Sequence, residues 1–335
     1  MTELISRRGF LGTGTVLGAG LGAWHGAFAQ SDWPHRPVKL IVPFSPGGAT
    51  DVVARLLGDG MQKSMGAGQS FIVDNRTGAG GAIGTAAVAK AVPDGLTLTV
   101  GLTSSLLVNQ FQYKNLGYDP RKDLILISQL ALAPMAVCVP EKVPAKNMAQ
   151  LQQYLAARQG KVSYGSYGSG SYSHLVLEHM NKSLRADMVG VHYRGEAAVM
   201  QALLAGEVDI GIGSGVVALP QAKAGKVRVV GITGPHRLEA LPDVPTLIEQ
   251  GMTDDAYRIL GWVAMAAPAK TPPEIILRLA REAAIVMQSE QTKERLKGLG
   301  LVALGNTPQQ FKQAYDRDYP VWKRLFEASG AKVEE

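Results

Sequence analysis

The sequence predicts an α/β protein of two lobes, each a doubly wound, mostly parallel sheet flanked by helices. Short apolar runs alternate with longer helical stretches, beginning with a strand at 38–43 and a helix at 49–65. The strand runs are almost continuously apolar, which is typical of parallel strands buried on both faces. The alternation occurs in two series, so we expect two sheets rather than one.

The first series covers residues 33–133 and the second covers residues 134–234. In the first we expect strands at 38–43, 71–75, 96–102 and 124–132, with helices at 49–65 and 82–91. In the second we expect strands at 135–139, 162–164, 188–191, 208–212 and 227–233, with helices at 148–158, 172–184, 197–205 and 216–224. The chain is expected to cross between the lobes near Pro134 and again near residue 234.

Residues 235–335 are expected to return to the first lobe and complete it. A strand at 258–266 precedes a helix that begins at Pro272-Pro273 and ends at residue 288, since proline is favoured in the first helical turn. A second helix follows at 290–298. A third begins at the capping-box pattern Thr307-x-x-Gln310 and ends near residue 328.

The first 29 residues have the pattern of an export signal. A twin arginine, Arg7-Arg8, precedes an apolar run at 11–23, and Ala27-Phe28-Ala29 supplies the small residues of a cleavage site. The arginine pair indicates the Tat pathway and hence a periplasmic protein. The alternative is a retained membrane anchor, but the run is short and rich in glycine, so we expect cleavage before Gln30.

Composition narrows the chemistry that the chain can carry. Its one cysteine, Cys138, lies in an apolar run, so we expect a small buried residue and exclude cysteine-based metal sites. The formal net charge is +6, but Lys and Arg are spread along the chain without a basic block. We therefore expect no nucleic-acid partner, whereas a mildly positive field is compatible with an anionic small molecule.

Several segments rich in Gly and Ser directly follow predicted strands. Ligands of open α/β sheets bind beyond the carboxyl ends of the strands. These segments place backbone N–H groups at helix starts, beside hydroxyl groups. Together such groups can bind an anion without a metal or a cofactor. Because they come from both lobes, we expect them to face one cleft. The candidate ligand-binding residues are Ser45, Pro46, Gly47, Gly48, Ala49, Thr50, Asp51, Thr103, Ser104, Ser105, Gly168, Ser169, Gly170, Ser171, His174, Tyr193, Gly195, Glu196 and Ser214.

Three of these candidates have two interpretations each. Asp51 and Glu196 either accept from an ammonium or hydroxyl group of a ligand, or are acids in the first turn of a helix, where the dipole favours them. His174, near the start of its helix, is a pocket or a packing residue. If Asp51 contacts the ligand, its replacement by alanine should change selectivity more than folding.

Signatures of catalysis are weak in this chain. It contains neither Gly-x-Ser-x-Gly nor a Walker A motif. The pattern Gly78-x-Gly80-x-x-x-Gly84 could cradle a pyrophosphate, but the next predicted strand is not followed by an acid for a ribose. His174 and His179 are five residues apart, off a common helix face, so we expect no metal and no cofactor. The alternative to a binding protein is an enzyme, either an exported hydrolase or a nucleotide-dependent enzyme.

Motifs spread along the chain are shared with one known family. They are WPHRPV at 33–38, IVPFSPGGATD at 41–51, DNRTGAGG at 74–81, AVPDGLTL at 91–98, AGEVD at 205–209 and LPDVPT at 241–246, followed by AAP at 266–268 and TPP at 271–273. Through them the chain resembles the tripartite tricarboxylate transporter receptor family, the Bug-type periplasmic solute-binding proteins.

The resemblance implies a function as well as a fold. It implies a two-lobed, type II-like periplasmic binding protein with a Venus-flytrap fold that closes on a small solute, usually a carboxylate. Such a protein is not an enzyme, and it delivers its solute to membrane permease subunits. We expect a monomer. Within the binding class, the alternative is an orphan sensor that feeds a signalling partner.

The resemblance also assigns roles to residues. It implies that backbone amides and waters at 45–51 and 103–105 hold the ligand carboxylate, and that 168–174, Tyr193, Gly195 and Glu196 contribute from the second lobe. Three stretches depart from the family's usual pattern. They are Tyr167-Gly168-Ser169-Gly170, which lacks a common Asn; Arg194-Gly195-Glu196-Ala197, which replaces a Lys-Gly-small run; and 210–215, which lacks a common Phe and Asp or Asn. Because all three would face the ligand, the solute cannot be transferred from a relative.

Overall fold

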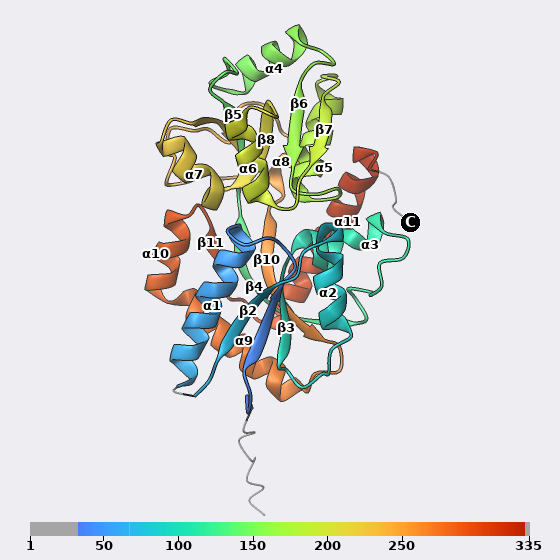
Figure 1. The fold of residues 1–335 in the computed structure, drawn as a ribbon, viewed down its shortest axis with the longest axis vertical. Helices are drawn as coiled ribbons and strands as arrows, with labels where there is room; N and C mark the ends of the chain where they lie inside the picture. The colour runs from blue at the N-terminus through green and yellow to red at the C-terminus, as the bar shows by residue number, and fades with distance from the viewer. Residues whose placement is uncertain (1–32, 67, 332–335) are drawn as a thin grey trace, which may run out of the picture. The chain divides into compact units, whose positions relative to one another are not determined.

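The computed structural model describes residues 33–66 and 68–331, and the expected export signal at 1–29 lies outside them. Within this part the chain forms two mixed sheets, with helices packed around each (Figure 1). We call each sheet with its packed helices a lobe. Among the described residues, no helix is long and apolar enough to span a bilayer.

The first sheet has the strand order β11-β4-β10-β3-β1-β2. Its strands are β1 (Val38–Val42), β2 (Phe71–Asn75), β3 (Thr97–Leu102), β4 (Leu124–Ala133), β10 (Gly261–Pro268) and β11 (Val302–Ala303). Strand β1 runs parallel to β2 and β3, whereas β10 is antiparallel to both β3 and β4. The late strand β10 therefore lies in the middle of the first sheet, between β3 and β4.

The second sheet has the order β7-β6-β8-β5-β9. Its strands are β5 (Met135–Pro140), β6 (Ser163–Ser166), β7 (Val189–His192), β8 (Ile210–Ser214) and β9 (Val227–Ile232). Strand β6 is parallel to β7 and β8, and β5 is antiparallel to β8 and β9. Both sheets are thus mixed, but most strands of each run in one direction: β10 and β11 oppose the other four in the first sheet, and β5 opposes the other four in the second. A continuous apolar run indicates that a strand is buried on both faces. It does not indicate strand direction, because an antiparallel strand can be buried on both faces as well.

The helices agree with expectation wherever they are long. They are α1 (Ala49–Met65), α2 (Ala82–Ala89), α3 (Asn109–Gln112), α4 (Met148–Ala157), α5 (Tyr172–Ser183), α6 (Glu196–Ala205), α7 (Gly215–Lys223), α8 (Asp255–Arg258), α9 (Pro273–Gln288), α10 (Glu290–Gly298) and α11 (Pro308–Ser329). The sequence did not predict α3, α8, β11 or a π-helical turn at Ser104–Val108. Elements of so few residues do not complete a hydrophobic period.

Helix starts differ in how they are capped, and this difference positions the site. Helix α11 begins with the predicted capping box, in which the Thr307 hydroxyl and the Gln310 side chain accept from each other's backbone N–H. Helices α1, α6 and α7 instead have Gly48, Gly195 and Ser214 as their N-cap residues, and no side chain of these residues forms a capping hydrogen bond. Their first-turn amides therefore remain available for other acceptors.

The buried core joins early and late parts of the chain. Trp262 at the start of β10 is fully buried and packs edge-on against Phe311 of α11, with ring centroids 5.1 Å apart. Helix α11 also contacts α5 of the second lobe, where Tyr172 packs on Trp322 (Figure 1). Cys138 is fully buried in β5, as predicted, and burial raises its thiol pKa to about 12.

Candidate functional site

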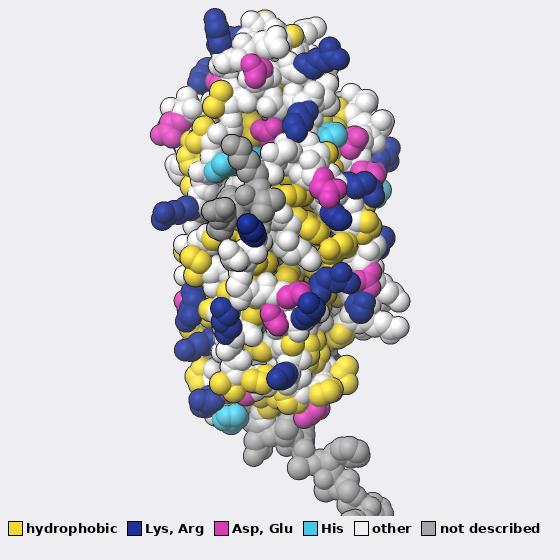
Figure 2. Space-filling model, turned by 90° about the vertical axis from the view of Figure 1, so that its right-hand side faces the viewer, with side chains coloured by type: hydrophobic (Ala, Val, Ile, Leu, Met, Phe, Trp, Pro, Cys, Tyr) yellow, Lys and Arg dark blue, Asp and Glu magenta, His cyan; other side chains and the backbone are white. Residues whose placement is uncertain are grey.

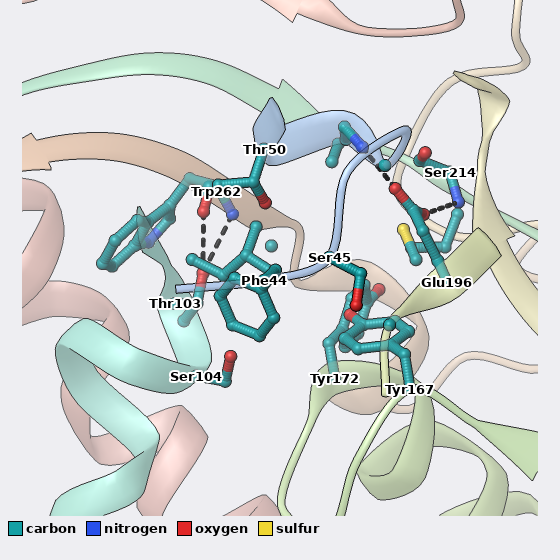
Figure 3. Close-up of a pocket in the computed structure, with 17 residues that line it drawn as sticks. Phe44, Ser45, Thr50, Thr103, Ser104, Tyr167, Tyr172, Glu196, Ser214 and Trp262 are labelled. Carbon is teal, nitrogen blue, oxygen red and sulfur yellow. Dashed lines mark hydrogen bonds between the residues drawn. The ribbon is translucent and has the colours of Figure 1, made fainter. Parts of the chain in front are cut away.

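A cavity of about 40 Å³ lies between the two lobes, where helix starts from both sheets meet (Figure 3). Its lining residues are Phe44, Ser45, Gly48, Ala49, Thr50, Leu102, Thr103, Ser104, Ala133, Met135, Tyr167, Tyr172, Gly195, Glu196, Ser214, Gly261 and Trp262. Most of the lining is apolar or aromatic. Among the described residues that line it, Glu196 is the one charged side chain.

Glu196 links the two lobes through backbone amides. Its Oε1 accepts from the N–H of Ala49, the first residue of α1, and its Oε2 accepts from the N–H of Ser214 at 2.8 Å (Figure 3). Ser214 is the N-cap of α7, and Glu196 is itself the first residue of α6. One carboxylate therefore lies at three helix N-termini, where the partial positive charge of the helix dipoles favours an anion.

The glycine before α1 permits this approach. A Cβ atom added to Gly48 would lie 2.9 Å from Glu196 Oε1, closer than a side chain allows. A larger residue at this position would push the carboxylate away from the α1 amide. Close approach of the carboxylate thus explains one of the two glycines in the motif at 41–51.

Asp51 is in the same loop but faces away from the cavity. Its carboxylate accepts from the Gly47 N–H, from Arg55 Nε and from Asn75 Nδ2, each at 3.1 Å. Burial alone would raise the Asp51 pKa, but these hydrogen bonds and the Arg55 charge outweigh burial and hold the pKa below its ordinary 3.8. The contacts favour the first-turn acid of the sequence analysis, with Asp51 holding the loop in shape.

Further contacts between the lobes surround the cavity. Ser45 Oγ donates to the Arg194 carbonyl at 2.5 Å, and Gly195 has a φ of +113°, a left-handed conformation that favours glycine. On another side, a Cβ atom at Gly170 would lie 1.8 Å from Gln112 Oε1 of the first lobe. The glycine loop of the second lobe therefore rests directly on α3.

Aromatic rings supply much of the cavity wall. Figure 3 shows Phe44, Tyr167 and Tyr172 around the same space as Ser45. The Tyr172 hydroxyl donates to the Ile259 carbonyl at 2.7 Å, which leaves its ring as the lining surface. Burial raises the pKa of Tyr167, and the nearby charge of Glu196 raises it further, so this tyrosine stays neutral.

Two serines that line the cavity have buried hydroxyls without a partner among the described residues. The Oγ atoms of Ser104 and Ser214 are buried, and neither has a hydrogen-bond partner among the described residues. Thr103 is different, because its Oγ1 accepts from the Trp262 N–H at 2.9 Å and so fixes the start of β10. A buried hydroxyl without a partner is costly, so the two serines offer hydrogen bonds to a bound molecule.

His174 is buried close to the cavity but does not line it. Its Nδ1 accepts from the Gly170 N–H at 3.0 Å, and its ring packs edge-on against His192, with centroids 4.6 Å apart. Burial and the neighbouring His192 lower the His174 pKa to about 4, so the ring is neutral at neutral pH. It acts as a packing residue that holds the glycine loop.

A larger hollow of about 500 Å³ adjoins the cavity and shares Phe44, Ser45, Tyr167 and Gly195 with it. Gly168 and Tyr193, both expected at the site, line this hollow.

On the face that Figure 2 shows, Lys and Arg side chains are interspersed with Asp and Glu rather than gathered into one patch.

The structure brings together about half of the residues expected from the sequence. Ser45, Gly48, Ala49, Thr50, Thr103, Ser104, Gly195, Glu196 and Ser214 line the cavity. Pro46, Gly47, Asp51, Ser105, Gly168, Ser169, Gly170, Ser171, His174 and Tyr193 are not among its lining residues. The segment 103–105 also differs from the expected loop, because a helical turn starts there directly after β3.

Sequence reasoning missed several lining residues. They are Phe44, Leu102, Ala133, Met135, Gly261 and Trp262. Phe44 adjoins the predicted segment at 45–51, so treating an aromatic neighbour as lining would have found it. Tyr167 and Tyr172, which also line the cavity, lie in stretches that the resemblance places at the ligand. Ala133 and Met135 flank the crossing at Pro134, and Gly261 begins a strand whose place in the sheet only the fold determines.

Known proteins match this chain over nearly all of its described part. The family model for the tripartite tricarboxylate transporter family receptor matches residues 53–331. BugT from Bordetella pertussis is 31% identical over 334 residues, which cover 99% of both chains.

Solved structures agree with the fold. An R. palustris protein with adipate is 30% identical with a TM-score of 0.86, covering 90% of this chain and 99% of its own. MatC from Rhodopseudomonas palustris, with bound malate, is 30% identical with a TM-score of 0.81, covering 88% of this chain and 99% of its own. The chain therefore belongs to the tripartite tricarboxylate transporter receptor family, the Bug-type periplasmic solute-binding proteins.

Proposed function

We propose that this protein captures a small organic acid in the cavity between its lobes. The observation that carries the proposal is a pair of residues that line one cavity, Ser104 from the first lobe and Ser214 from the second, whose buried hydroxyls have no partner among the described residues. Hydrogen bonds from hydroxyls to a carboxylate are charge-assisted and stronger than neutral ones. A ligand bound to both serines would hold the two lobes together.

Relatives support the chemical class of the ligand. The two R. palustris structures contain adipate and malate, which are both carboxylates. Ser45, Thr50, Thr103 and the aromatic walls would surround the rest of the solute. Closure of two lobes on a ligand requires that the ligand contact both, since only differential contacts shift such an equilibrium.

The wider role follows from the family. We propose that residues 1–29 are a Tat-type signal, that the protein works in the periplasm, and that it passes its solute to permease subunits of a tripartite tricarboxylate transporter. Its lobes would be residues 33–133 with 235–335, and residues 134–234. The family's receptor function supports a binding role without catalysis. We also propose that the protein acts as a monomer and uses no cofactor.

A binding screen with three serine variants tests the proposal. Thermal shift and isothermal titration with mono-, di- and tricarboxylates, amino acids and aromatic acids should identify at least one stabilising acid. Ser104→Ala and Ser214→Ala should weaken its binding roughly tenfold or more, because each removes a charge-assisted hydrogen bond. Both variants should melt near the wild-type temperature, since neither hydroxyl satisfies a partner in the described structure.

Ser105→Ala is the matched control. The Ser105 hydroxyl donates to the Leu102 carbonyl at 3.3 Å, and the residue does not line the cavity. Its loss should leave ligand affinity unchanged. If no acid stabilises the protein and it turns over an ester or a nucleotide, the proposal of a receptor is wrong and the protein is an enzyme.

A further inference from the structure

Glu196 occupies two helix-start amides, those of Ala49 and Ser214, which could otherwise donate to an anion. We propose that Glu196 is a built-in carboxylate at these amides, and that it makes this receptor select solutes with one carboxylate and a hydrogen-bond donor over dicarboxylates. This inference rests on the proposed function and names the solute class for the same cavity.

The first step is that one amide at the start of α1 and one at the start of α7 are already engaged by Glu196. One Glu196 oxygen accepts a hydrogen bond from the Ala49 N–H and the other accepts from the Ser214 N–H. The two lobes are therefore joined without a ligand atom. A ligand carboxylate could use these amides only by displacing Glu196. Of the residues that line the cavity, Ser104 and Ser214 have hydroxyls without a partner among the described residues, and Ser104 belongs to the lobe opposite Glu196.

The second step is charge. Among the described residues that line the cavity there is no Lys, Arg or His to offset Glu196. Two unit charges about 4 Å apart near a protein surface interact strongly enough to change affinity by roughly a hundredfold to a thousandfold. A second ligand carboxylate beside Glu196 would therefore be rejected, whereas one at Ser104, which lies across the cavity from Glu196 (Figure 3), is tolerated.

The third step is the acceptor capacity that Glu196 retains. A carboxylate offers about four lone-pair sites, and the two amides use one on each oxygen. The remaining sites can accept from an ammonium or a hydroxyl group of the solute. Because Glu196 lines the cavity, this donor has to belong to a solute that reaches the cavity.

A matched series of four-carbon acids tests the inference on the purified protein. Succinate, butyrate, 4-aminobutyrate and 4-hydroxybutyrate differ only at the end opposite the shared carboxylate. Malonate, propionate, β-alanine and 3-hydroxypropionate repeat the comparison with three carbons. Titration calorimetry of wild type, Glu196→Gln and Glu196→Ala measures each affinity. Glu207→Gln, which removes an exposed acid outside the cavity, is the control.

For wild type we expect a donor-bearing acid to bind at least tenfold more tightly than the dicarboxylate of the same length. Glu196→Gln and Glu196→Ala should each reduce this ratio at least tenfold, and Glu207→Gln should leave it unchanged. A larger gain with the amino acids than with the hydroxy acids identifies an ammonium as the partner, and the reverse identifies a hydroxyl.

Two failures are distinguishable. Tight dicarboxylate binding by wild type, or a ratio that neither Glu196 variant changes, overturns the inference and leaves the proposed function standing. Absence of binding by every acid, including those of the wider screen, overturns the proposed function and the inference together. Melting curves establish that each variant is folded, and the two substitutions differ in size, so one folded variant is sufficient.

Discussion

Asp51 in α1 and Glu196 in α6 are both first-turn acids of helices, but the fold uses them in opposite ways. The Asp51 carboxylate folds back onto its own loop and pairs with Arg55 and Asn75, all within the first lobe. The Glu196 carboxylate reaches amides of α1 and α7, and no ion pair with it occurs among the described residues.

The difference follows from the position of each acid in its helix. Asp51 is the third residue of α1, where a side chain can turn back to the amides that precede the helix, as in a capping box. Glu196 is the first residue of α6 and extends away from it. One acid therefore stabilises a lobe, and the other connects two lobes.

The largest expected effect comes from removing Asp51. Asp51→Ala leaves Gly47, Arg55 and Asn75 without their shared acceptor, so we expect a loss of about 3 kcal/mol in the free energy of unfolding. Denaturant titration measures it. This reverses the expectation that Asp51→Ala changes selectivity more than folding. Unchanged stability with an altered ligand preference would restore Asp51 as a ligand contact.

Acid titration should separate His174 from Asp51. Because the folded-state pKa of His174 is lowered to about 4, the unfolded chain takes up a proton first as pH falls from about 6.5. Stability present above that pH should decline by up to about 3 kcal/mol on the way to pH 4. The contribution of Asp51, whose pKa is lowered, should be lost only as pH falls further, below its ordinary 3.8.

Melting curves from pH 7 to pH 3 for wild type and His174→Asn measure this profile. Asparagine can still accept from the Gly170 N–H but does not titrate, so the slope between pH 6.5 and pH 4 should flatten. An unchanged slope in the variant would assign the acid sensitivity to other groups.

A smaller effect is expected at the amide of Ala49. Ala49→Pro removes the N–H that Glu196 accepts from, while proline is well accommodated as the first residue of a helix and Gly48 already has the extended conformation that precedes proline. We expect a loss of about 1–2 kcal/mol and a shift toward separated lobes. Small-angle scattering reports the separation.

Ala49→Gly, which keeps the N–H, is the control for that variant and should scatter like wild type. Equal scattering and equal melting of the proline and glycine variants would mean that the Glu196 contact does not hold the lobes together.

The smallest effect is expected for Arg55→Gln. The Arg55 side chain is 52% exposed, so its ion pair with Asp51 should contribute about 1 kcal/mol or less. The variant should therefore retain most of the stability that Asp51→Ala loses, as measured in the same denaturant titration. A loss as large as that of Asp51→Ala would mean that the cation, rather than the amides, holds Asp51.

The sequence alone determined what depends on neighbours along the chain. The hydrophobic period located the long helices and the strands, the Thr307 capping box located the start of α11, and glycine before α1 and α6 indicated amides open to an acceptor. These features are local because a helical turn or a cap involves residues within four positions.

Tertiary structure decided the rest. Strand direction, the place of β10 between β3 and β4, and the meeting of Ala49 with Glu196 across 147 residues depend on packing that no local pattern encodes. The sequence could nominate Asp51 and Glu196 as equivalent first-turn acids. Which amides each carboxylate reaches depends on the elements that the fold places beside it. For this reason Asp51 contacts its own loop, whereas Glu196 lines the cavity.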